Sequence, residues 1–158
     1  MSIDQSAFRS VLGRFATGVT VVTARGSRGR DVGMTVSAFS SVSLDPPLVM
    51  ICIDHAASAY NVLSKAECFT VNILSAGQEA IARRFALTES NRFDGLGYDR
   101  GENAAIALRD VLAQIECDVV DRHEAGDHDI IIGSVEIVHT ADGRPLLYYR
   151  GGYAQLER

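Results

Sequence analysis

The residues with the clearest chemical potential lie within residues 33–43, a stretch of small side chains. If this stretch is a strand, alternation places one set of hydroxyls on the face opposite its apolar side chains: Thr35, Ser37, Ser41 and Ser43. A row of hydroxyl and backbone donors beside little steric bulk could hold a flat polar ligand without any charged catalytic side chain. The same pattern also fits an exposed strand face whose hydroxyls bind water.

The common motifs for phosphate binding and for nucleophilic catalysis are absent. The sequence contains no Walker A motif, no GxGxxG motif and no GxSxG nucleophile elbow. Its three cysteines, Cys52, Cys68 and Cys117, lie in apolar, strand-like surroundings, whereas a nucleophilic thiol needs an electropositive setting. No CxxC motif occurs, so we expect small buried thiols in a reducing compartment.

A metal site is also not expected. His123, Asp127 and His128 lie close together in the sequence, but their spacing matches no established metal-binding motif. Turns are rich in such residues for reasons of backbone geometry alone. We therefore interpret this segment as a turn.

The composition is typical of one acidic globular domain. The chain has 158 residues and a mass of 17.0 kDa, with 15 Lys and Arg against 20 Asp and Glu, which gives a net charge of −5. Nucleic acid is not an expected partner, because phosphate neutralisation needs a basic face.

The longest apolar run has about eight residues (46–53), whereas a membrane span needs roughly 20. The N-terminus lacks the basic and apolar regions of a secretory signal. We expect a single cytoplasmic domain over residues 1–158.

Apolar periodicity predicts the helices that frame the hydroxyl-rich stretch. Apolar residues at positions 8, 11, 12 and 15 make one stripe at helical spacing, which predicts a helix over residues 4–16 capped by Asp4. Further helices are predicted over residues 58–65 and over residues 75–87, where the latter begins with a capping box.

The remaining elements are predicted to be strands. Alternation and β-branched residues predict strands over residues 19–23, 32–44, 48–53, 69–74 and 146–150, and a long hairpin turning at 126–128. Residues 88–105 are polar and glycine-rich, and a surface loop of this length is usually functional or mobile. Because the strands cluster instead of alternating with long helices, we expect a small closed or nearly closed antiparallel barrel with two or three peripheral helices.

Six segments, in order along nearly the whole chain, share the pattern of one known family: residues 15–23, 33–47, 69–74, 85–86, 126–128 and 145–149. Each segment is weak alone, but their order and spacing are specific. Through them the chain resembles the short-chain flavin reductases of the flavin reductase-like domain family. Known members include reductase components of two-component flavin-dependent monooxygenases.

The resemblance implies a mainly β fold, namely a split β-barrel of the Greek-key, FMN-binding type with a few peripheral α-helices, assembled as a homodimer. It implies an NAD(P)H:flavin oxidoreductase that reduces FMN or FAD and supplies reduced flavin to a partner monooxygenase. NADH is favoured over NADPH, because no obvious basic cluster for a 2′-phosphate is present. The alternative is a non-catalytic flavin-binding or electron-carrier protein. A heme- or pyridoxamine-related split barrel fits the hydroxyl row less well.

The resemblance also assigns site residues by position. The flavin ring and ribityl chain would contact Thr35, Val36, Ser37, Ala38, Ser40 and Ser41. The ribityl phosphate would approach Cys52, Ile53, Asp54, Ser58 and Tyr60, and the phosphate or adenylate end would approach Arg83, Arg84 and Phe85. The nicotinamide nucleotide would contact His128, Tyr149, Arg150, Gly151, Gly152 and Tyr153. No catalytic side chain is expected, because hydride transfer depends on positioning, with His128 as an orienting residue.

Overall fold

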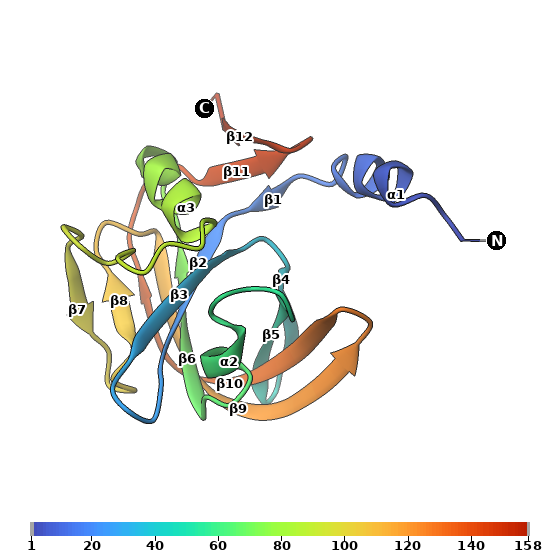
Figure 1. Ribbon diagram of the computed structural model, residues 1–158. Helices are drawn as coiled ribbons and strands as arrows, with labels where there is room; N and C mark the ends of the chain where they lie inside the picture. Colours follow the sequence, from blue (N-terminus) through green and yellow to red (C-terminus); the bar gives the residue numbers. More distant parts are fainter. Residues whose placement is uncertain (1, 158) are drawn as a thin grey trace.

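A seven-stranded antiparallel sheet curls around the main core in the computed structural model, which describes residues 2–157 (Figure 1). In spatial order its strands are β3 (Asp31–Val36), β2 (Thr20–Arg25), β6 (Cys68–Ile73), β9 (Ala113–Ala125), β10 (His128–Thr140), β5 (Pro47–Asp54) and β4 (Phe39–Leu44). Within the described residues β3 and β4 remain edges, so hydrogen bonds do not close the sheet. The predicted mainly β split barrel is confirmed, whereas full closure of the barrel is not.

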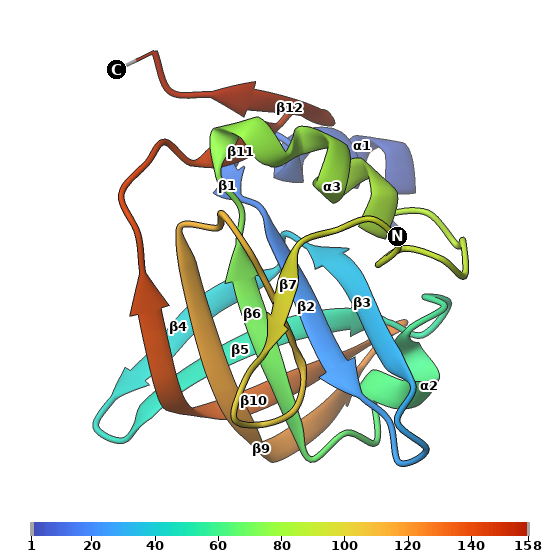
Figure 2. The same ribbon diagram turned by 90° about the vertical axis from the view of Figure 1, so that its left-hand side faces the viewer.

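Short elements gather at one end and one side of this barrel. A three-stranded sheet consists of β1 (Thr17–Gly18), β11 (Leu146–Tyr149) and β12 (Gly152–Gln155). A small ribbon pairs β7 (Tyr98–Arg100) with β8 (Ile106–Leu108). The helices are α1 (Gln5–Leu12), α2 (Tyr60–Leu63), η1 (Ala76–Gln78) and α3 (Glu79–Phe85). Figures 1 and 2 show α1, α3 and the three-stranded sheet at the same end of the barrel. No helix among residues 2–157 is long and apolar enough to cross a membrane.

Two hydrophobic clusters are separated by β2, which is buried on both faces. Because successive side chains of a strand point to opposite faces, Val22 packs inside the barrel with residues such as Ile51 and Phe69. Its neighbour Val21 packs with Phe85 of α3 on the other side. This burial on both faces explains why the sequence of β2 is a nearly continuous run of β-branched residues. It also packs α3 against the barrel.

The prediction of one continuous strand over residues 32–44 is wrong, because the structure divides this stretch into β3 and β4. The chain bends at Ser37 and Ala38, where the Phe39 N–H donates to the Ser37 carbonyl at 2.9 Å. The Ala38 carbonyl then accepts from the Cys52 N–H at 3.0 Å. The break is needed because β3 and β4 form opposite edges of the sheet. The predicted row of hydroxyls is therefore not continuous.

The predicted helices exist but are shorter than expected. The Asp4 carboxylate caps α1 by accepting from the Ala7 N–H at 3.1 Å, as predicted, but the helix ends at Leu12. It ends there because Thr17 must be extended to pair with Tyr148 of β11. The predicted helix over 58–65 is only α2, and the helix over 75–87 consists of η1 with its capping box followed by α3.

The long C-terminal hairpin is confirmed as β9 and β10, which turn at Gly126 with a φ of 66°. Residues 88–105, predicted as one loop, include β7, which pairs back onto β8.

Replacement of Gly133 by alanine is predicted to destabilise the fold. A Cβ atom at this β10 position would lie 2.6 Å from Phe69 Cζ and 2.8 Å from Cys117 Cβ. Because packed interiors resist added volume, Gly133→Ala should lower the free energy of unfolding by about 1–3 kcal/mol in urea denaturation. The control is Gly18→Ala, where a Cβ meets nothing within 4 Å. Equal unfolding midpoints for the two variants would contradict the packing described here.

Candidate functional site

A cleft of about 650 Å³ opens at the end of the barrel beside α1, and we call it the α1 cleft. Its volume is in the range of small-molecule sites, which run from about 300 to about 1,000 Å³. Helix α1, the ends of several strands and two turns contribute its lining: Gln5, Phe8, Arg9, Leu12, Gly13, Phe15, Thr17, Ser37, Asp54, Asp127, His128, Tyr148 and Gly151.

Strand register brings four predicted site residues together in this cleft. The pairing of β5 with β10 places His128 directly opposite Asp54. Ser37 lies in the bend between β3 and β4. Gly151 lies in the turn between β11 and β12, where its φ is 77°. These four residues come from distant parts of the sequence, yet all line the α1 cleft.

One ring nitrogen of His128 already has a partner. Its Nδ1 lies 2.6 Å from Oδ1 of Asp127, and this hydrogen bond lowers the pKa of the Asp127 carboxyl. Because a carboxylate only accepts, Nδ1 carries the proton that is donated to it. The Nε2 atom is the ring nitrogen left for a ligand, so His128 can orient a polar group at the cleft.

The cleft also contains an apolar wall and an unsatisfied hydroxyl. The wall is made by Phe8, Leu12 and Phe15 from the helical segment and by Tyr148 from β11. Thr17 Oγ1 is buried and has no hydrogen-bond partner within residues 2–157. Since a buried hydroxyl without a partner is unfavourable, this atom indicates a ligand with a polar edge over an apolar body. The cleft therefore fits a flat heterocycle such as a flavin ring.

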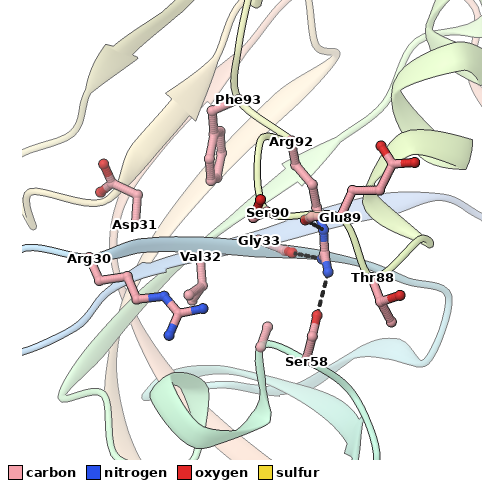
Figure 3. A pocket seen from close by; sticks show the side chains of 11 residues that line it. Arg30, Asp31, Val32, Gly33, Ser58, Thr88, Glu89, Ser90, Arg92 and Phe93 are labelled. Atoms are coloured by element: carbon pink, nitrogen blue, oxygen red, sulfur yellow. Dashed lines mark hydrogen bonds between the residues drawn. The ribbon is translucent and has the colours of Figure 1, made fainter.

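A second, smaller pocket of about 130 Å³ surrounds the Arg92 side chain (Figure 3), and we call it the Arg92 pocket. Arg92 is 8% exposed, and its guanidinium donates to the Gly33 carbonyl at 2.7 Å and to the Glu89 carbonyl at 2.9 Å. The third nitrogen donates to the Ser58 hydroxyl. Arg30 lines the same pocket.

The Arg92 guanidinium has no carboxylate partner among the ion pairs of the described chain. Burial lowers the pKa of Arg92, as expected for a cation removed from water. A buried guanidinium that lines a pocket beside a hydroxyl is suited to phosphate oxygens, which its fork of donors can bind in pairs. The Arg92 pocket therefore fits a phosphate group, and Ser58 is the predicted site residue that lies in it.

Several functional candidates were not identified by sequence reasoning. The apolar stripe of α1 was interpreted only as a helix face, and Thr17 only as part of the family pattern. Arg92 lies in the polar segment predicted as a loop, and its place in a long glycine-rich loop was the only sequence feature that could have drawn attention to it.

The predicted arginines of α3 lie apart from both pockets. Arg83 forms an exposed ion pair with Glu79 at 2.7 Å, and its guanidinium carbon lies 4.9 Å from the ring centre of Tyr153. Neither Arg83 nor Arg84 lines the α1 cleft or the Arg92 pocket. Phe85 is a core residue that packs edge-on against Phe93.

Other predicted residues near the hydroxyl stretch use their polar atoms within the protein or bury their side chains. The Thr35 hydroxyl donates to the Ala82 carbonyl at 2.6 Å, and the Ser40 hydroxyl donates to the Ser41 carbonyl at 2.9 Å on the exposed edge strand. Val36 and Ile53 have buried side chains, so only their backbone atoms could reach a ligand. Ala38 is exposed in the bend between β3 and β4.

The remaining predicted residues are Tyr60, whose hydroxyl donates to Asp129, and the C-terminal turn. In this turn Arg150 has a φ of 51° and its N–H donates to the Gly13 carbonyl at 2.8 Å. Tyr149 is exposed, whereas Gly152 and Tyr153 are half-buried in β12.

The three cysteines are free. Burial raises the pKa of Cys52, a half-buried residue, and raises the pKa of Cys117 to about 12. Such thiols are poor nucleophiles, which agrees with a site that works without a covalent intermediate.

Comparison with known proteins places the chain among flavin reductases. A flavin reductase from Pseudomonas putida is 42% identical over 153 residues, covering 96% of this chain and 90% of that protein. The flavin-dependent monooxygenase reductase subunit HsaB of Mycobacterium tuberculosis is 36% identical over 98% of this chain and 84% of its own length. The NADH:FAD oxidoreductase SgcE6 of Streptomyces globisporus, solved with NAD and FAD fragments, superimposes with a TM-score of 0.92 at 37% identity, covering 97% of this chain and 93% of that one.

The model of the flavin reductase like domain matches residues 12–157, which include every strand and every predicted site residue. With the split barrel and the two pockets described above, this match confirms the resemblance: the chain belongs to the flavin reductase like domain family.

Proposed function

We propose that this protein uses NADH to reduce FMN or FAD, with the flavin ring in the α1 cleft and its phosphate in the Arg92 pocket. One observation carries the assignment: the structure combines a cleft that has an apolar wall and polar groups with a second pocket in which a buried guanidinium has no carboxylate partner among the described residues. Asp54 lines the cleft and Ser58 lies in the Arg92 pocket, four residues later. At about 3.8 Å per residue, the Cα atoms of Asp54 and Ser58 lie within about 15 Å of each other, a span that one ligand can bridge.

Positioning is the main task of the protein in this reaction. A bound flavin supplies the acceptor for the hydride that leaves the nicotinamide ring, so no side chain needs to form a covalent bond. The Ser37 and Thr17 hydroxyls are available to donate to the polar edge of the flavin ring, where negative charge develops on reduction. The apolar wall of α1 excludes water from the opposite side.

His128 orients the nicotinamide. With Nδ1–H held by Asp127, its Nε2 is free to accept from the carboxamide of the nicotinamide. The carboxylates of Asp54 and Asp127 line the same cleft, where Arg9 is the only arginine or lysine of the lining. These carboxylates would repel the 2′-phosphate of NADPH, which favours NADH. A non-catalytic flavin carrier would need no such second nucleotide site, so the reductase is favoured over that alternative.

The proposed setting is the cytoplasm, where three free cysteines remain reduced and a partner monooxygenase can take up the reduced flavin. We also propose a homodimer. No residue of α1 is buried against its own chain, even though the helix carries an apolar stripe. Phe8, Val11 and Leu12 are exposed, and Phe15 just beyond the helix is 78% exposed. A second copy of the chain would cover this apolar face and complete the α1 cleft, which α1 lines.

His128→Ala should raise the KM for NADH by about tenfold, because the variant loses one oriented hydrogen bond to the nicotinamide nucleotide. The affinity for FMN, measured by fluorescence titration, should stay within about twofold. His123→Ala is the matched control, since His123 lies on the same hairpin and pairs with Asp121 outside the cleft. An unchanged KM for NADH would remove His128 from the site.

Arg92→Met should weaken FMN binding by about tenfold, because charge-assisted hydrogen bonds to the phosphate are lost. Binding of riboflavin, which has no phosphate, should remain unchanged in the same variant and reports any damage to the ring site. Arg109→Met, which breaks only an exposed ion pair with Asp99, is the control. Equal losses for FMN and riboflavin would show that Arg92 supports the fold and not the phosphate.

The double substitution Phe8→Asp with Leu12→Asp should convert a dimer into a monomer in sedimentation analysis, because charges replace the apolar contact. Leu87→Asp, at an exposed leucine after α3, should leave the dimer intact. A wild-type chain that sediments as a monomer would contradict the proposed assembly.

A further inference from the structure

One carboxylate outside the two pockets connects the elements that carry them. Asp129 follows His128 on β10, and its side chain is 13% exposed. Its Oδ1 atom lies 2.8 Å from Nε2 of His55, and its Oδ2 atom accepts from the Tyr60 hydroxyl at 2.9 Å. Both oxygens are therefore bound to side chains of the loop that follows β5.

This loop, residues 55–60 including the first residue of α2, is attached to the β9–β10 hairpin at both of its ends. The His55 N–H donates to the Asp127 carbonyl at 2.9 Å, which continues the pairing of β5 with β10 by one step. The rings of His55 and Tyr60 lie 5.0 Å apart, so the two ends of the loop also contact each other. Asp129 thus holds the loop closed and fixes it to β10.

The loop and the turn each carry a group used by the proposed function. Ser58, inside the loop, accepts from Arg92 in the phosphate pocket, whereas His128, beside Asp129, lines the cleft. We propose that Asp129 is a positioning residue that holds the phosphate loop and the nicotinamide-side turn in one geometry, so that flavin binding and NADH binding are energetically coupled. This inference rests on the proposed function, because it assigns a flavin phosphate to the loop and a nicotinamide to the turn.

The charges around the cluster make the connection dependent on pH. The hydrogen bond that His55 donates to Asp129 raises the pKa of His55, and the hydrogen bonds donated by His55 and Tyr60 lower the pKa of Asp129. Glu124 of β9 and Asp127 of the turn also favour protonated His55, and Arg122 favours ionised Asp129. The ion pair is complete between the lowered pKa of Asp129 and the raised pKa of His55, and it is lost as pH rises through the pKa of His55. Coupling should weaken in the same direction.

Asp129→Ala tests the inference through the split between KM and kcat. The variant should raise the KM for FMN and the KM for NADH by about fivefold or more each, with kcat within about twofold of the wild type. The matched control is Asp121→Ala, which breaks a similar pair at 3.0 Å with His123 on the same hairpin. If Asp129→Ala does not fold, Tyr60→Phe decides, because it deletes a single hydroxyl and should raise both KM values in the same direction.

A pH series separates positioning from a structural role. The wild-type KM for FMN should rise as pH increases through the raised pKa of His55, above the ordinary titration range of an imidazole. His55→Gln keeps an N–H that can donate to Asp129 but carries no charge and cannot titrate, so its KM for FMN should be independent of this ionisation and lie near the high-pH value of the wild type.

Unchanged KM values in Asp129→Ala or Tyr60→Phe, or a rise in only one of the two, would overturn the coupling while wild-type turnover stands. A wild type that shows no flavin-dependent NADH oxidation would instead overturn the proposed function itself.

Discussion

The antiparallel pairing of β10 with β5 is the interaction on which the rest of the site depends. Its register sets His128 opposite Asp54 and leaves the next backbone hydrogen bond to His55 and Asp127, so the turn and the loop of residues 55–60 start from one fixed point. The other edge of β10 pairs with β9 over nearly its whole length, which holds the turn from the opposite side. A shift by one residue would move His128 to the other face of the sheet, and the cleft would lose its only histidine.

The open edges of the barrel serve the same arrangement. Because β3 and β4 do not pair with each other, the chain between them can bend at Ser37 and present its hydroxyl to the cleft. Close packing at Gly33 is equally important, since a Cβ there would lie 2.9 Å from Phe85. The bare backbone at this position lets α3 approach β3 and leaves the Gly33 carbonyl to hold Arg92. The Arg92 pocket is thus built from local backbone polarity and one buried cation.

Much of the fold was predictable because its patterns are local. Alternation and Gly126 predicted the β9–β10 hairpin, and the capping box predicted the start of η1. The bend at Ser37 and Ala38 was missed because the alternation of small polar and apolar residues continues through it without Gly, Pro, Asn or Asp, and only the position of β4 across the sheet requires a bend. Arg92 was missed for a related reason, since its burial comes from packing of a loop against β3, far away in sequence. The apolar stripe of α1 predicted a helix, but periodicity does not reveal what covers it. The family resemblance named Ser37, Asp54, His128 and Gly151 as site residues, and the structure brings them into one cleft. Arg83 and Arg84, which the resemblance also named, line neither this cleft nor the Arg92 pocket.

The central claim is that this cleft brings a nicotinamide and a flavin together for hydride transfer. The most direct test is the oxidation of NADH by the purified protein, followed by the loss of NADH absorbance with and without added FMN or FAD. The account predicts saturable turnover that requires flavin and is faster with NADH than with NADPH. Tight flavin binding without NADH oxidation would contradict it and would make the protein a flavin carrier.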